Sequence, residues 1–179
     1  MICARAKKNI RVPKADLEFL EMDGADYLPE EGRLFDVSSY IGASWVYSGH
    51  EGTLKALSEV TKPGGLVIVG EPFWLGKPSG KYLESQEVKK EDYGTHLSNI
   101  DTGESLGLTC VYTLVSNHDD WDHYETLQWL ALDNYIRINP EDEDIPDLVH
   151  KSSIFKRGYI EEGRDILGWS IYVFRKPQE

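Results

Sequence analysis

The order of apolar and polar positions in residues 34–74 predicts a strand, a helix and a second strand. Residues 35–40, with Phe35, Val37 and Tyr40, have the pattern of a short buried strand, and the apolar side chains of residues 51–61 recur on one face of a helix. Residues 66–70 form a second apolar run. Two short apolar strands joined by a helix are typical of parallel sheets, so the pattern predicts a βαβ unit.

The polar stretches of this unit predict where a ligand would bind. A Lys-Pro-Gly-Gly turn at residues 62–65 separates the helix from the second strand. The loops at residues 41–45 and 71–74 each follow a strand. Right-handed crossover places both loops at the same edge of the sheet, which is where open α/β sheets bind their ligands.

The second half of the chain combines strands with long helices. Residues 109–115 are rich in β-branched side chains and predict a strand, and apolar spacings of three and four predict a helix over residues 121–139. A second helix is expected over residues 144–164, and clean alternation predicts a last strand over residues 168–174.

The first twenty residues predict shorter elements. Residues 1–9 are basic toward their end, which suits the C-terminal turn of a helix. Residues 17–20 form a short apolar run that predicts a strand, followed by an acidic Met-Asp-Gly-Ala stretch.

Composition narrows the class of protein. The chain has 179 residues, enough for one domain with a sizeable core. Its formal charge of -12 disfavours polyphosphate, so no nucleic-acid partner is expected; solubility is the simpler reason for such a charge. Cys3 and Cys110 provide no disulfide framework, and no apolar run has the length of a signal-peptide core or a membrane span. A cytoplasmic protein without a membrane partner is expected.

Residues 116–124 contain two histidines and three aspartates, a composition that raises the question of a metal site. His118 and His123 are five residues apart and do not share a helix face. Asn117 or Asp119 would serve as a helix N-cap, with acidic residues suiting the first turn. The start of a helix is therefore favoured, and no metal is expected.

The segment from Asp36 to Trp74 resembles the second half of class I S-adenosylmethionine-dependent methyltransferases. The matching residues are Tyr40-Ile41-Gly42-Ala43 and the Lys-Pro-Gly-Gly turn before a strand that ends in Glu-Pro-aromatic. The resemblance implies a Rossmann-like α/β sheet, mostly parallel, with an antiparallel C-terminal pair of strands at residues 109–115 and 169–174. It implies one partial domain over residues 1–179, with a helical insertion at about residues 119–165.

The resemblance begins late in the family's fold. The family's first strand and its glycine-rich cofactor loop have no counterpart in this sequence, so an N-terminally incomplete domain is expected. The edge of residues 35–40 would then be open and prone to association. We therefore expect one of three outcomes. The chain forms a homodimer through that edge, residues 17–20 pair directly with residues 35–40, or the chain is stable only with the lost segment. A nicotinamide-dependent oxidoreductase is a weak alternative, because its glycine fingerprint is also absent.

The resemblance also implies site residues, each with a simpler alternative. The adenine of the cofactor would contact the loop after residues 17–20, for which a solvated turn is the alternative. Its methionine end would contact the loop after residues 35–40, for which a tight strand exit is the alternative. These candidates are Met22, Asp23, Gly24, Ala25, Tyr40, Ile41, Gly42 and Ala43. Glu71 is the expected general base, with Tyr93 and His96 as weaker candidates, whereas His50 is expected only to begin a helix. Aromatic residues would contact the substrate or simply pack in the core: Trp45, Phe73, Trp74, Trp121 and Tyr124.

The function expected from these residues is transfer of a methyl group from S-adenosylmethionine to a small-molecule acceptor. The alternative is a non-catalytic methyltransferase-like remnant that acts as a binding or dimerisation module. Binding of the cofactor would distinguish the two.

Overall fold

The computed structural model describes residues 18–178. The chain divides into two units between Arg33 and Leu34. Residues 18–33 hold one short 3₁₀ helix, η1, at Gly24–Asp26. Residues 18–20 have no strand structure, so the strand predicted at residues 17–20 is wrong over its described part. Leu17 and the helix end predicted at residues 1–9 lie outside the described residues.

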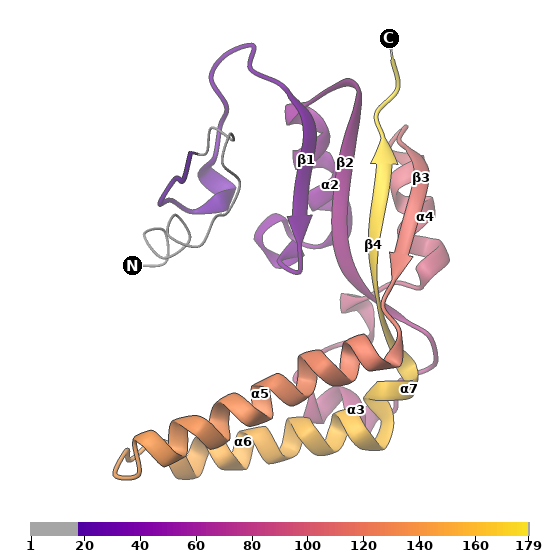
Figure 1. The fold of residues 1–179 in the computed structure, drawn as a ribbon. Helices are drawn as coiled ribbons and strands as arrows, with labels where there is room; N and C mark the ends of the chain where they lie inside the picture. Colours follow the sequence, from indigo (N-terminus) through magenta and orange to yellow (C-terminus); the bar gives the residue numbers. More distant parts are fainter. Residues whose placement is uncertain (1–17, 179) are drawn as a thin grey trace. The chain divides into compact units, whose positions relative to one another are not determined.

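The second unit is built on a four-stranded sheet with the order β1-β2-β4-β3 (Figure 1). The strands are β1 (Phe35–Ile41), β2 (Thr61–Trp74), β3 (Thr109–Val115) and β4 (Leu167–Arg175). β1 and β2 run parallel, and β4 runs antiparallel to both β2 and β3. The parallel βαβ unit and the antiparallel C-terminal pair are thus confirmed.

Helices connect the strands, and the two longest helices lie between β3 and β4. α2 (His50–Val60) joins β1 to β2, while α3 (Gly80–Ser85) and α4 (His96–Ser105) lie between β2 and β3. Two antiparallel helices, α5 (His118–Ile138) and α6 (Ile145–Gly158), separate β3 from β4 (Figure 1). A π-helical turn at Tyr159–Gly163 and α7 (Arg164–Ile166) lead into β4. None of the helices in the described part is both long and apolar enough to cross a membrane.

The polar run before α5 is a helix start, as favoured from the sequence. Asn117 is the N-cap: its side chain accepts a hydrogen bond from the backbone of Asp120, and Asp120 accepts one from the backbone of Asn117. This reciprocal capping box satisfies two backbone donors that the first turn would leave free. Within residues 18–178, no three His, Cys, Asp or Glu side chains converge as metal ligands.

The strand β2 is longer than the sequence predicts. Thr61 pairs with Phe35 and Leu66 with Val37, so residues 62–65 bulge out of a continuous strand instead of forming a turn before it. At its other end β2 pairs with β4 as far as Trp74, so residues 71–74 are a strand and not the predicted loop. β1 ends at Ile41 opposite Gly70, which makes Glu71 the first residue of β2 beyond the end of β1.

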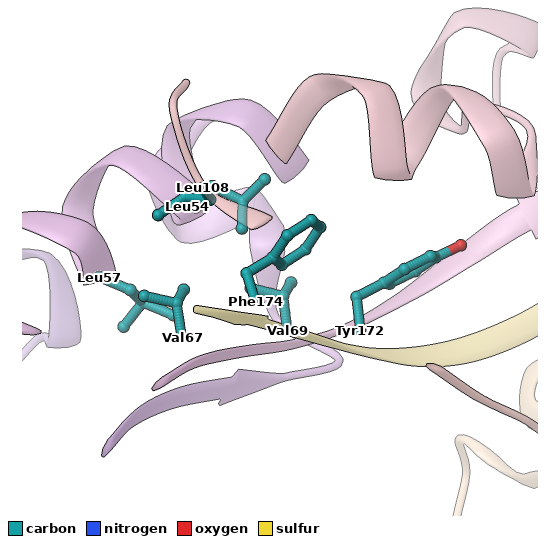
Figure 2. Close-up of a cluster of buried hydrophobic side chains, with 7 residues drawn as sticks. All are labelled: Leu54, Leu57, Val67, Val69, Leu108, Tyr172 and Phe174. Carbon is teal, nitrogen blue, oxygen red and sulfur yellow. The ribbon is translucent and has the colours of Figure 1, made fainter. Parts of the chain in front are cut away.

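The core lies between the sheet and the helices α2 and α4, which cover one face of it (Figure 1). Alternate residues of β2 and β4 point into this layer, and Figure 2 shows them facing α2. Each fully buried apolar side chain contributes about 1.5–3 kcal/mol to folding. The members of this cluster are Leu54, Leu57, Val67, Val69, Leu108, Tyr172 and Phe174.

Candidate active site

The predicted base, Glu71, is buried where β2 extends past β1. Its side chain is only 3% exposed, and its Oε1 accepts a hydrogen bond of 2.9 Å from the Ser44 hydroxyl. Ser44 begins the 3₁₀ helix η2 (Ser44–Tyr47), which directly follows the loop after β1. The other carboxylate oxygen, Oε2, is buried and has no hydrogen-bond partner among the described residues. This acceptor is therefore left unsatisfied among the described residues.

The surroundings of Glu71 change its acidity. Burial raises the pKa of Glu71 to about 7, and the hydrogen bond from Ser44, which favours the ionised form, opposes this rise. A carboxyl group that titrates near neutral pH can accept and release a proton under the same conditions. Glu71 therefore has the acidity that a general base requires.

A buried network of polar side chains lies on the same face of the sheet. The Tyr172 hydroxyl accepts a hydrogen bond of 3.2 Å from the Asn99 side chain and lies 3.0 Å from His96 Nδ1. The His50 Nε2 lies 3.0 Å from the carbonyl oxygen of Asn99. Burial lowers the pKa of His50 and raises the pKa of Tyr172 to about 12, so both groups are neutral at pH 7.

The three candidate catalytic residues lie in one region. The His96 ring makes tilted contacts with the rings of Phe73 and Tyr172, whose centroids are 4.8 Å and 5.3 Å away. Burial, and then the charges of Asp92 and Glu71, raise the pKa of Tyr93, which places Tyr93 within electrostatic range of Glu71. Their catalytic roles stay predictions.

Sequence reasoning missed Ser44, Asn99 and Tyr172 and assigned His50 only to a helix start. Tyr172 occupies an inward position of an alternating strand, a pattern that indicates core packing and gives no sign of a polar partner. Its contacts with α4 join residues more than seventy positions apart. Only the tertiary fold brings these groups together.

The loop after β1 comes close to its neighbours through glycine. The Gly42 amide donates a hydrogen bond of 3.1 Å to the carbonyl of Gly70, and its φ of 69° is in the left-handed region. A Cβ atom at this position would lie 3.2 Å from the Trp169 ring. Ile41 is 49% exposed, and the Tyr40 ring meets that of Tyr47 edge-on.

A cavity of about 500 Å³ opens next to this loop. Its size is within the range of small-molecule sites, and the absence of a side chain at Gly42 gives a ligand access to the backbone. The resemblance assigns residues 40–43 to the methionine end of S-adenosylmethionine, and this role stays a prediction. The lining residues are Ile41, Gly42, Ser116, Asp120, Trp121, Tyr124 and Trp169.

The candidate substrate residues lie in three different environments. Trp121 and Tyr124 line the cavity beside Gly42. Trp45 is 75% exposed and lines a second, polar cavity of about 690 Å³ together with Tyr93. Phe73 and Trp74 are buried core residues. Direct contact with a substrate is therefore most accessible to Trp121, Tyr124 and Trp45.

The candidate adenine-binding residues belong to the first unit. Asp23 is the N-cap of η1, because its Oδ1 accepts a hydrogen bond of 3.0 Å from the Ala25 amide. This is the turn geometry that the alternative interpretation expects, and Asp23 keeps a second oxygen. Met22 is 48% exposed. The role of residues 22–25 in cofactor binding stays a prediction.

Known proteins of similar sequence and structure support the expected fold. The uncharacterized protein YjhP of Escherichia coli (strain K12) is 26% identical over 159 residues, which cover 88% of this chain and 63% of YjhP. A methyltransferase from Geobacter sulfurreducens, solved with S-adenosyl-L-homocysteine, matches with a TM-score of 0.80 and 24% identity, over 88% of this chain and 63% of that one. One from Thiobacillus denitrificans, also with S-adenosyl-L-homocysteine, has a TM-score of 0.78 and 28% identity, over 87% and 63%.

These similarities have a defined extent. The chain spans less than two thirds of the length of each of these relatives. No protein-family model matches the sequence. The agreement in strand order, crossover and antiparallel pair concerns the architecture, and the chain has the Rossmann-like α/β fold of S-adenosylmethionine-dependent methyltransferases.

Proposed function

We propose that the chain forms the acceptor-side part of an S-adenosylmethionine-dependent methyltransferase that acts on a small molecule. The observation that carries this proposal is Glu71, a buried carboxyl group with a pKa raised to about 7 at the edge of the sheet beyond β1. It is linked through Ser44 to the loop that contains Gly42. A carboxylate with only a structural role is rarely buried without a cationic partner, so the environment of Glu71 supports a catalytic role.

The cofactor explains why so few catalytic groups are needed. S-adenosylmethionine supplies a methyl group already activated on a sulfonium, so the protein mainly positions the reactants and excludes water. Gly42 and its neighbours would hold the methionine end. Asp23, Met22, Gly24 and Ala25 would contact the adenine.

The role of Glu71 in this proposal is to accept a proton from an O–H or N–H group of the acceptor. Its pKa near 7 leaves a large ionised fraction at neutral pH, and the ionised form is the base. Tyr93 and His96 are the flanking candidates for the same role. General-base catalysis of this kind contributes roughly 10²- to 10⁴-fold to a rate.

A small-molecule acceptor agrees best with the cavity sizes and the charge. The cavity beside Gly42 has about 500 Å³, and the chain carries a net charge of -12, which opposes binding of nucleic acid. A cytoplasmic location is part of the same proposal.

Transfer of a labelled methyl group to a panel of small acceptors tests the proposal in the full-length protein. Glu71→Gln is compared with Glu51→Gln, which alters an exposed carboxylate paired with Lys55. We expect a loss of at least about 100-fold for Glu71→Gln and none for Glu51→Gln. Equal turnover by both variants would contradict the role of Glu71 as the general base.

A specific observation also supports the non-catalytic alternative. Within residues 34–178, the outer edge of β1 pairs with no strand, and Val37 and Ile41 are about half exposed. An open edge of this kind favours pairing with another chain, or with the family's first strand, which the resemblance places there. If a second copy covers the edge, Val37→Lys turns a dimer into a monomer in analytical ultracentrifugation.

A further inference from the structure

We propose that the cavity beside Gly42 binds an organic ammonium group, and that the methyl acceptor is accordingly a small amine. The inference rests on the proposed function and adds the chemical class of its substrate. It is carried by three aromatic rings, one carboxylate and the absence of a basic residue among the described residues that line the cavity.

The rings form a connected cluster. Trp121 lies edge-to-face with Tyr124, with centroids 6.0 Å apart, and edge-to-face with Trp169, with centroids 6.5 Å apart. Edge-to-face contacts leave ring faces uncovered by stacking, and all three rings are among the residues that line the cavity. The face of an aromatic ring attracts a cation, and Trp does so most strongly.

The charge of the cavity favours the same kind of ligand. Asp120 is the one charged side chain among the described lining residues, and neither Lys nor Arg is among them. The hydrogen bond from the Asn117 amide engages only Oδ2 of Asp120, so Oδ1 can accept another bond. A carboxylate beside aromatic rings, in a chain of charge -12, selects a cation over a neutral or anionic molecule.

A neighbouring cavity of about 530 Å³ shares Trp121 and Tyr124 but differs in charge. Its lining includes Glu125, whose pKa is raised by burial, and also Lys151, which pairs with Glu87. A mixed pair of charges does not select a cation. The selectivity is therefore assigned to the cavity beside Gly42, and the second cavity has room for the remainder of the molecule.

The position of the cavity suits methyl transfer to nitrogen. The cavity reaches Gly42, in the loop proposed to hold the methionine end of the cofactor. Only the free amine has the lone pair that attacks, so the bound ammonium first gives up one N–H proton. Asp120, the one carboxylate among the described lining residues, is available to accept that proton. Attack on the methyl group then forms the nitrogen–carbon bond and breaks the sulfur–carbon bond of the sulfonium, which leaves as a neutral thioether.

Choline and 3,3-dimethyl-1-butanol test the inference, because they share shape and hydroxyl group and differ in charge. We expect choline to bind about fivefold more tightly in a saturation-transfer NMR titration, since cation–π contacts contribute about 1 kcal/mol at partly exposed sites. Asp120→Asn keeps the oxygen that caps α5 and removes the charge, so it is expected to abolish most of the preference. Trp121→Leu is expected to do the same.

Asp133→Asn on the same helix is the control, because Asp133 pairs with Arg137 on the exposed surface. It is expected to keep the preference for choline. Equal binding of the two probes, or a preference that survives Asp120→Asn, would overturn the inference. Titration with S-adenosylhomocysteine separates the two proposals. Cofactor binding without a preference for choline would contradict only the proposal of an amine substrate. A preference for choline without cofactor binding would contradict the proposed methyltransferase function.

Discussion

The hydroxyl of Ser44 donates a hydrogen bond of 2.9 Å to Oε1 of Glu71. This bond joins the segment after β1 to the extended end of β2, twenty-seven residues later in the chain. It favours the ionised carboxylate, whereas burial favours the protonated form. The acidity of the proposed base therefore depends on how the segment after β1 meets the extended end of β2.

Glu71→Gln is expected to change how stability depends on pH. Folding raises the pKa of Glu71 from 4.5 to about 7, so the folded state binds more protons than the unfolded state between these values. Stability is therefore lost as the pH rises through this window, by about 3 kcal/mol. In urea unfolding, the unfolding free energy of the wild type should fall between pH 5 and pH 8 by about this amount more than that of Glu71→Gln. An equal pH dependence in both proteins contradicts the assignment. His50 has a lowered pKa and acts in the opposite direction in both, so it cancels in the comparison.

Ser44→Ala is expected to shift the pH dependence of methyl transfer upward. Without the hydroxyl, the ionised form of Glu71 loses its hydrogen bond, so the pKa of Glu71 rises further above its ordinary value. The base then becomes active only at higher pH, and the rising limb of the rate profile moves with it. Ser44→Thr keeps a hydroxyl and serves as the control. If the pH–rate profile of Ser44→Ala is the same as that of the wild type, Glu71 does not take part in the rate-determining proton transfer.

Gly42→Ala is expected to disturb the loop after β1 in two ways. A φ of 69° costs a residue with a side chain about 1–2 kcal/mol, and the new Cβ lies 3.2 Å from Trp169. Gly107 has a φ of 81° with nothing within 4 Å of its Cβ, so Gly107→Ala carries the backbone cost alone. Gly42→Ala should lose at least as much stability in urea unfolding as Gly107→Ala. Only Gly42→Ala should weaken binding of S-adenosylhomocysteine, and equal binding by both would exclude the loop from the cofactor site.

Asp122→Asn is expected to loosen α5 from the residues that follow α6. Asp122 accepts hydrogen bonds from the Tyr159 hydroxyl at 2.7 Å and from Arg164 Nε and Nη2 at 2.9 Å and 3.0 Å. Two parallel bonds from an arginine fix both side chains in position. Hydrogen exchange in α5 should become faster than in the Asp133→Asn control, whose ion pair with Arg137 is on the surface. Identical exchange in the two variants would show that the contact does not hold the helix.

Much of the architecture could be predicted because it is encoded locally. Four elements can be predicted without reference to the rest of the chain. β1 has the pattern of a short buried strand, β3 is rich in β-branched residues, α5 is amphipathic and β4 alternates. The limits of β2 could not be predicted in this way. Its extension to Trp74 follows from pairing with β4, about a hundred residues later. The apolar run at residues 17–20 shows the opposite case, since residues 18–20 have no strand structure despite their composition.

The candidate site was predictable in part for the same reason. Glu71 and Gly42 follow apolar strands, and the sequence places such residues at the edge where ligands bind. Ser44, Asn99 and Tyr172 could not be chosen, because each is one polar residue among many until the fold brings them together. Trp169 illustrates the point further: it fits the pattern of a strand, and only the sheet places its ring against Gly42.

Calorimetric titration of the 179-residue chain with S-adenosylhomocysteine tests the central claim most directly. The account predicts saturable binding in the micromolar range that Gly42→Ala weakens and Gly107→Ala leaves unchanged. Absence of binding would contradict a cofactor site formed by this chain, and would favour the non-catalytic module that associates through the open edge of β1.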